Sequence, residues 1–142
     1  MTIYLGADHA GYRLKEKVKA GLIADGHTVR DLSPTFKDGD DYPAPARAVA
    51  MRVAKHNGSR GVLVCGSGVG MAIGANRVKG VRAFDAFDTT TTKMAREHND
   101  ANVIALSGWH LNASKAKKLL DIFFRTRFSS ASRHHRRVRQ LG

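Results

Sequence analysis

Reactive sulfur is scarce in this sequence, which contains a single cysteine, Cys65. One cysteine excludes an intrachain disulfide framework and is typical of a reducing compartment. Long apolar runs are also missing: the longest uncharged stretch, residues 61–76, is rich in glycine and shorter than the ~20 apolar residues of a spanning helix. The amino terminus shows no basic segment followed by an apolar one, so no signal peptide is visible. We therefore expect a cytoplasmic protein with no membrane partner.

Acidic side chains are few, because 12 Asp and Glu stand against 24 Lys and Arg, which gives a net charge of +12. None follows Asp121, whereas six arginines do, so the last 21 residues carry half of this charge. Such an excess favours an anionic partner: nucleic acid, an acidic surface or a phosphorylated small molecule. Aromatic residues are also few, and Phe123, Phe124 and Phe128 follow helical spacing rather than forming an exposed stacking platform, which disfavours a nucleic-acid-binding module.

Short apolar runs alternate along the chain with segments whose apolar residues recur at helical spacing. The run at 61–65 is uninterrupted, as expected for a strand that is covered on both faces. No repeat, linker or low-complexity segment divides the 142 residues. We predict strands at 3–5, 27–32, 61–65, 81–84 and 103–106, and helices at 12–24, 43–54, from the glycine-rich turn to about 78, and at 89–99, 113–126 and 132–141.

This alternation implies right-handed parallel crossovers. The predicted fold class is α/β: a three-layer sandwich with a five-stranded, parallel, Rossmann-like sheet and a C-terminal basic helix, in a single domain over residues 1–142. The common strand order 2-1-3-4-5 places the point where strand order reverses between the first and third strands, and ligands bind there beyond the carboxyl ends. Loops 6–11 and 65–70 should therefore form the site.

The first of these loops holds two adjacent titratable residues, Asp8 and His9. They are candidates for proton transfer and anion binding, although Asp8 as a helix cap and His9 as a surface residue would explain them equally well.

Three alternate glycines, Gly66, Gly68 and Gly70, follow the third strand and open a helix. Their backbone N–H groups can turn inward and form an anion cradle. A nucleotide-binding domain is the alternative, with Asp85 as its ribose-binding acid. However, Met71 stands where a dinucleotide fingerprint needs its third glycine, and no Walker A lysine is present.

Cys65 ends the third strand at this cradle. A lone cysteine there is often an inert apolar residue, but a helix N-terminus favours the thiolate, which could act as a base or a nucleophile. Ser67 could donate a hydrogen bond to an oxyanion or cap the helix.

Two further groups of polar residues lie later in the chain. His98 and Asn99 end the fourth helix, and we expect them beside the same rim, where His98 could handle hydroxyl protons; a polar helix end favoured by the dipole is the alternative. Arg133 and Arg137 share one face of the last helix, with His134 beside them, as a phosphate clamp or as a generic basic face. Three close carboxylates, Asp38, Asp40 and Asp41, have no spacing typical of a metal cage.

A thiol, an oxyanion cradle, a proton-moving histidine and an arginine pair together suit the aldose–ketose isomerisation of a sugar phosphate. The sequence resembles the ribose-5-phosphate isomerase B family. This family belongs to a wider group that includes galactose-6-phosphate isomerase subunits and members active on allose 6-phosphate. The resemblance covers nearly the whole chain. Its motifs are Gly6-Ala-Asp8-His9-Ala-Gly11, Asp41-Tyr42-Pro43, Cys65-Gly66-Ser67-Gly68-Val69-Gly70, Ala75-Asn76-Arg77, Gly80-Val81-Arg82-Ala83, His98-Asn99-Asp100-Ala101-Asn102, and Arg133-His134 with Arg137.

The resemblance implies interconversion of D-ribose 5-phosphate and D-ribulose 5-phosphate through an enediolate, a step of the pentose phosphate pathway. Cys65 would be the base, Ser67 would lie near the reacting oxygens, and His98 would open the sugar ring with Asp8 or Asp41. The implied substrate-binding residues are His9, Asp41, Tyr42, Gly66, Gly68, Val69, Gly70, Asn99, Arg133, His134 and Arg137.

The same resemblance implies a homodimer or homotetramer, in which the arginine-rich tail, residues 127–142, reaches the partner's site. It implies no cofactor and no metal. One departure concerns the phosphate: Trp109 stands where many relatives carry an arginine that binds it. Another sugar phosphate, allose 6-phosphate or a tetrose phosphate, is therefore an alternative substrate, whereas galactose 6-phosphate is disfavoured because its isomerase needs two different subunits.

Overall fold

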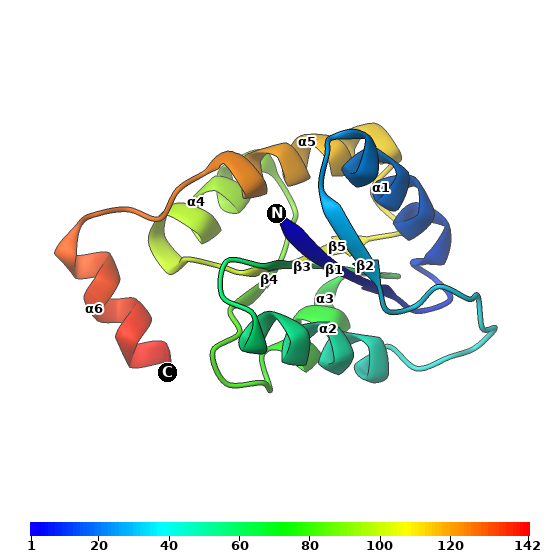
Figure 1. Cartoon of the computed structure of the whole chain (residues 1–142), viewed down its shortest axis with the longest axis horizontal. Helices are drawn as coiled ribbons and strands as arrows, with labels where there is room; N and C mark the ends of the chain where they lie inside the picture. The colour runs from blue at the N-terminus through cyan, green and yellow to red at the C-terminus, as the bar shows by residue number, and fades with distance from the viewer.

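Strands and helices alternate as the apolar pattern predicts in the computed structural model, which describes all 142 residues (Figure 1). Their order is β1 (Thr2–Ala7), α1 (Tyr12–Ala24), β2 (Thr28–Asp31), α2 (Pro43–Lys55), β3 (Arg60–Cys65), α3 (Val69–Ala75), β4 (Ala83–Asp85), α4 (Thr89–Asn99), β5 (Val103–Ser107), α5 (Ala113–Arg125) and α6 (Ser132–Leu141). All neighbouring strands pair in parallel. The predicted α/β sandwich is thereby confirmed.

Two apolar layers hold the sheet between its helices. Helices α1, α4 and α5 cover one face and α2 and α3 the other (Figure 1). Because side chains alternate along a strand, Val62 and Val64 of β3 pack into the first layer with Phe123, whereas Leu63 and Cys65 pack into the second with Met71. Strand β3 is thus buried on both sides, and Cys65 faces α2 and α3.

The predicted order of the last two strands is wrong: the sheet runs β2-β1-β3-β5-β4. Strand β5 is fully buried and lies beside β3, with Cys65 paired to Ser107. Strand β4 has only three residues, none of them buried, and it ends in Asp85. A short strand that ends in a charged residue suits an edge, where its unpaired backbone can meet water, so the more apolar strand takes the interior place. The reversal between β1 and β3 is unaffected.

Helix α6 stands apart from the sandwich, beside α4 at the β4 edge (Figure 1). Its main anchor is His134, which is buried, while the arginines on either side of it are exposed. None of the helices is both long and apolar enough to span a membrane.

Candidate functional site

The loops after β1 and β3 leave the sheet side by side, because Ala7 pairs with Val64. Asp8 is buried, and its Oδ1 accepts a hydrogen bond of 2.9 Å from the Gly11 amide. Gly11 itself lies against the Val64 carbonyl, where a side chain would collide with the backbone of β3. Asp8 therefore closes the turn that brings the start of α1 against β3, and its second oxygen is free for other partners.

Cys65 is held by the glycine-rich loop that follows it. The side chain is only 4% exposed, and its sulfur accepts a hydrogen bond of 3.2 Å from the Gly68 amide. Gly68 has φ of +92°, a conformation that favours glycine. Ser67 does not cap α3, whose N-cap residue is Gly68; its Oγ accepts a 3.3 Å hydrogen bond from the Val69 amide. The thiol and the Gly68 and Val69 amides thus lie in one turn.

The segment after β5 forms the next wall of this turn. The Gly108 amide donates to the Cys65 carbonyl at 2.7 Å, and the Ser107 hydroxyl donates to the Gly66 carbonyl at 2.7 Å. The Trp109 ring lies directly against Gly66 and remains 71% exposed. Trp109 therefore contributes an apolar surface beside the loop, at the position where the family resemblance suggests a phosphate-binding arginine.

The loop after β2 carries Asp40 and Tyr42 to the same edge, where Asp40 contacts His9 of the loop after β1. The His9 amide donates to Asp40 Oδ1 at 2.7 Å, and its Nδ1 lies 3.1 Å from the Asp40 carbonyl. This hydrogen bond to the Asp40 backbone, aided by the Asp40 and Asp8 carboxylates, raises the pKa of His9 and favours its cationic form. The Tyr42 ring lies about 2.8 Å from where a Cβ of Gly70 would stand. A cavity of about 650 Å³ beside Ala7 is lined by Asp40 and Asp41.

Asp85 also reaches this edge, although the motifs predicted no catalytic role for it. Its carboxylate lies against Gly68, although the residue as a whole remains exposed. Partial removal of this carboxyl group from water raises the pKa of Asp85. The sequence could have placed Asp85 at this edge, because Asp85 directly follows a predicted parallel strand and the carboxyl ends of parallel strands share one edge.

The other predicted residues lie at the opposite edge of the sheet, so the expectation that His98 and Asn99 share the Cys65 rim is wrong within one chain. Helix α4 runs antiparallel to the strands, and its end leads into the start of β5, where the Asn102 carbonyl accepts from the Gly61 amide. Cys65 lies at the far end of the same strand pair, about 15 Å away at ~3.3 Å per residue. Arg133, His134 and Arg137 follow His98 to this edge, on α6.

His98 and His134 stack with ring centroids 4.4 Å apart and planes 2° apart. Burial lowers the pKa of His134, and the positive charge of His98, Arg133 and Arg137 lowers it further. The contact therefore links the end of α4 to the arginine-bearing helix through a neutral imidazole.

We expect α6 docking to weaken in mild acid. The folded-state pKa of His134 lies below the unfolded value of about 6.5, so the unfolded chain binds more protons as the pH falls through that range, and stability is lost. The melting temperature of wild type should fall more steeply between pH 7.5 and 5 than that of His134→Phe, which keeps the stack without the proton site. His135→Phe, which removes an exposed neighbouring imidazole, is the control and should follow wild type. Parallel curves for wild type and His134→Phe would contradict this role.

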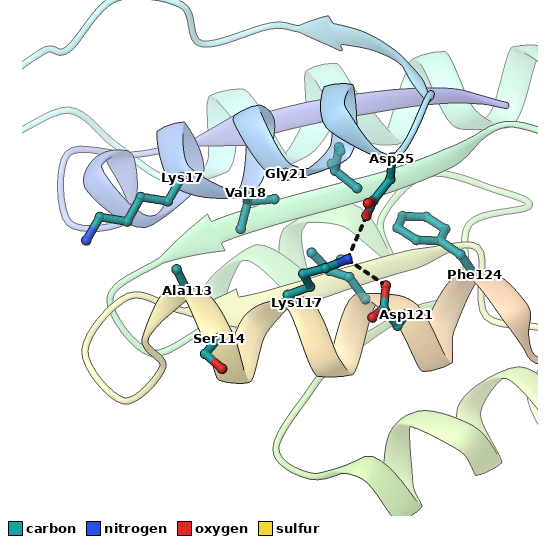
Figure 2. Close-up of a pocket in the computed structure, with 11 residues that line it drawn as sticks. Lys17, Val18, Gly21, Asp25, Ala113, Ser114, Lys117, Asp121 and Phe124 are labelled. Carbon is teal, nitrogen blue, oxygen red and sulfur yellow. Dashed lines mark hydrogen bonds and ion pairs between the residues drawn. The ribbon is translucent and has the colours of Figure 1, made fainter.

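One further cavity, of about 360 Å³, lies between α1 and α5 and contains none of the predicted site residues (Figure 2). Lys117 bridges Asp25 at 2.7 Å and Asp121 at 3.2 Å across its mouth. No three His, Cys, Asp or Glu side chains come close enough together to hold a metal ion.

Comparison with known proteins identifies relatives over almost the whole chain. The family model described as Ribose/Galactose Isomerase matches residues 3–141. Ribose-5-phosphate isomerase B of Mycobacterium tuberculosis H37Rv is 42% identical over 97% of this chain and 86% of that protein. The Escherichia coli K12 enzyme of the same name is 34% identical over 98% and 93%.

Solved structures agree with these relatives. A ribose 5-phosphate isomerase from Thermotoga maritima superposes with a TM-score of 0.94 at 37% identity, covering 99% of this chain and 96% of that one. Ribose-5-phosphate isomerase B of Mycoplasma genitalium, solved with bound ribulose-5-phosphate, gives 0.93 at 37% identity over 99% and 93%. The chain therefore belongs to the ribose/galactose isomerase family of enzymes.

Proposed function

We propose that this protein interconverts D-ribose 5-phosphate and D-ribulose 5-phosphate in the cytoplasm, as a step of the pentose phosphate pathway. The observation that carries the proposal is the buried Cys65 thiol, held by the Gly68 amide at the point where strand order reverses. A relative with the same fold, from Mycoplasma genitalium, has been solved with ribulose-5-phosphate bound. The excess positive charge of the chain suits a phosphorylated substrate.

In the proposed mechanism, Cys65 as thiolate removes the proton from C2 of the open-chain aldose and returns it to C1. The negative charge that develops on the C1 and C2 oxygens is stabilised by backbone N–H groups of Gly66 to Gly70, with Ser67 nearby. Fixed dipoles of this kind lower a barrier because they need no reorganisation as charge develops. His9 belongs to the same chain as Cys65. Its raised pKa favours the cationic form, which binds the substrate's phosphate group.

The proposed site is completed by a second copy of the chain, in a homodimer or a homotetramer. Ring opening by His98, with Asp8 or Asp41, needs His98 beside the sugar, yet His98 lies at the far edge of its own sheet. The partner's end of α4 and its tail, residues 127–142, would supply His98, Asn99, Arg133, His134 and Arg137. The separation within one chain supports this sharing.

Turnover of purified protein with ribose 5-phosphate in the presence of EDTA tests the proposal. We expect a kcat/KM for ribose 5-phosphate at least about tenfold above the values for allose 6-phosphate and a tetrose phosphate, since one lost substrate contact is worth about 1.4 kcal/mol or more. EDTA should leave the rate unchanged. A preference for a six-carbon or four-carbon substrate would reassign the activity, with Trp109 as the first residue to vary.

Replacement of Arg137 by alanine should raise KM by about 10-fold to 100-fold with a smaller change in kcat. A charge-assisted hydrogen bond to phosphate contributes about 1.5–3 kcal/mol, equally before and during the proton transfer. Arg139→Ala is the matched control, because residue 139 lies on the other side of α6 from residues 133 and 137. An unchanged KM in Arg137→Ala would remove the tail from phosphate binding.

A further inference from the structure

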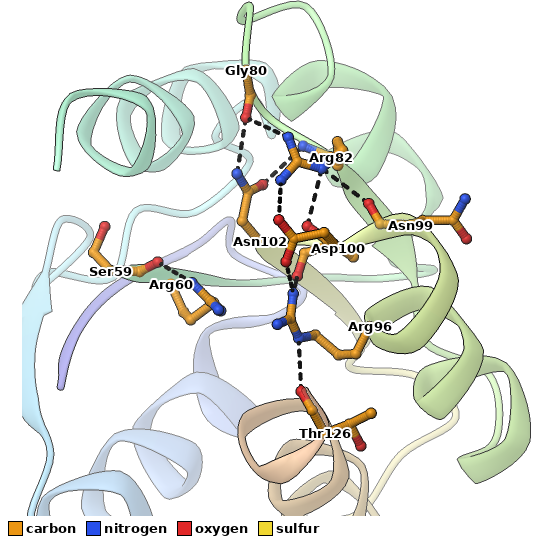
Figure 3. Close-up of polar contacts among 10 residues, drawn as sticks. Ser59, Arg60, Gly80, Arg82, Arg96, Asn99, Asp100, Asn102 and Thr126 are labelled. Atoms are coloured by element: carbon orange, nitrogen blue, oxygen red, sulfur yellow. Dashed lines mark hydrogen bonds and ion pairs between the residues drawn. The ribbon is translucent and has the colours of Figure 1, made fainter. Parts of the chain in front are cut away.

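Two arginines share one carboxylate at the amino-terminal edge of the sheet, away from Cys65, and a third arginine lies near them. Arg82 Nη2 donates to Asp100 Oδ2 at 2.8 Å, and Arg96 Nη1 donates to Asp100 Oδ1 at 2.8 Å (Figure 3). Both oxygens of Asp100 are therefore occupied. Arg60, the first residue of β3, points toward the same carboxylate but makes no ion pair with it.

Arg60 is a half-buried cation that forms no ion pair. Its one hydrogen bond runs from Nη1 to the carbonyl of the preceding residue, Ser59, at 2.9 Å. Burial lowers the pKa of Arg60, as do the charges of Arg96 and Arg82, and Asp100 is the only carboxylate that opposes them. A guanidinium carries five N–H donors, and charges withdrawn from water are normally paired. Most of the donors of Arg60 are therefore unused in a region of excess positive charge.

A cavity of about 170 Å³ opens at this place, lined by Arg60, Arg82, Asp100, Asn102 and the turn at 56–59. Only Val53 contributes an apolar side chain to its lining. The backbone N–H groups of Asn57 and Gly58 have no acceptor within the chain. The cavity is smaller than the ~300–1,000 Å³ typical of sites that enclose whole organic ligands, so it suits a small ion with a few waters.

We propose that this cavity, the Arg60 pocket, binds a phosphate dianion between the guanidinium groups of Arg60 and Arg82. Planar guanidinium groups match the oxygens of a tetrahedral oxyanion in paired hydrogen bonds. The anion is either free phosphate or the phosphoryl end of a small metabolite whose remainder lies outside the pocket. The site lies at the edge of the sheet opposite Cys65 and does not depend on the proposed isomerase activity.

Binding at the Arg60 pocket would also reinforce the segment that follows α4. Arg82 Nε donates to the carbonyls of Asn99 and Asp100, both at 3.0 Å. Asp100 ends α4 with φ of +46°, the left-handed conformation that few residues other than glycine, asparagine and aspartate adopt. An anion that neutralises Arg60 therefore removes its repulsion with Arg82 and Arg96 next to this turn, and the folded protein should gain stability.

Titration of isotopically labelled protein with inorganic phosphate, against chloride at equal ionic strength, tests the pocket. We expect the amide resonances of residues 57–60 and 100–102 to shift with saturation at millimolar phosphate, and the melting temperature to rise by about 3 °C. In Arg60→Gln both effects should disappear, while Arg30→Gln, which removes an exposed arginine on β2, should retain them. Phosphate that binds at the Cys65 loop should instead shift the amide resonances of residues 66–70, in wild type and in both variants.

Two results would overturn the proposal: unshifted pocket resonances in wild type, or equal shifts in wild type and Arg60→Gln. If Arg60→Gln does not fold, Arg60→Lys keeps the charge but loses the planar fork, and at least about a fivefold weaker phosphate affinity is expected. A second titration uses glycerol 3-phosphate in place of inorganic phosphate. Shifts at lower concentration than with inorganic phosphate would identify a metabolite's phosphoryl group as the ligand, and weaker binding would identify the free ion.

Discussion

Cys65→Ala is expected to lower kcat by at least about 10³-fold while the protein stays folded. A positioned general base contributes about 10²-fold to 10⁴-fold, and no second thiol exists in the chain to replace it. The loss should include exchange of the substrate's C2 proton with solvent, because this step uses the same base. Ribose 5-phosphate conversion and deuterium exchange at C2 would be measured on the same preparations.

Cys65→Ser distinguishes the role of Cys65 as a base from its role in holding the loop. The Cys65 sulfur is the acceptor for the Gly68 amide at 3.2 Å, and a serine oxygen can accept that hydrogen bond where alanine cannot. Both variants should be inactive, since an alcohol is a far weaker acid than a thiol, but Cys65→Ser should melt closer to wild type. If Cys65→Ser keeps more than about a tenth of wild-type turnover, the base lies elsewhere, and Asp8 and Asp85, at the same edge, would be the next candidates.

The site at the Cys65 edge could be predicted because local signals and topology agree there. The apolar run of β3 marks a central strand, and the glycines after Cys65 mark a turn that must approach other backbone closely. The parallel α/β pattern then brings the β1 and β3 loops together whatever the order of the remaining strands. The exchange of β4 and β5 could also have been predicted, because a strand that ends in Asp85 is a poor interior strand.

The position of His98 follows from the topology of a parallel α/β sheet, although the motif around His98 does not indicate it. A crossover helix runs back along the sheet, so the end of α4 must lie at the edge where β5 begins. The Arg60 pocket carries no such signal, because its arginines are far apart along the chain: Arg60 begins β3, Arg82 precedes β4 and Arg96 lies in α4. Only the fold shows that two guanidinium groups bind the Asp100 carboxylate and that Arg60 lies unpaired beside them.

Mixing two inactive variants should restore activity if the site is shared between subunits. Cys65→Ala and His98→Asn each damage one edge of the sheet, and these edges lie about 15 Å apart in a single chain. In a mixed dimer, one site receives both substitutions, whereas the other combines an intact Cys65 with an intact His98. Random assortment makes half of the dimers mixed, so about a quarter of wild-type activity is expected after the two variants are unfolded and refolded together.

A second mixture provides the matched control. Asp8→Asn and Cys65→Ala affect the same edge, because Ala7 pairs with Val64 and each site would take both residues from one chain. Every site in that mixture keeps one defect, so co-refolding should restore nothing. If activity is restored in the first mixture and not in the second, His98 must act on the substrate that is bound at the partner's Cys65 edge. Failure in both, with dimers present by light scattering, would place each site within one chain and require α4 and α6 to move toward Cys65 when substrate binds.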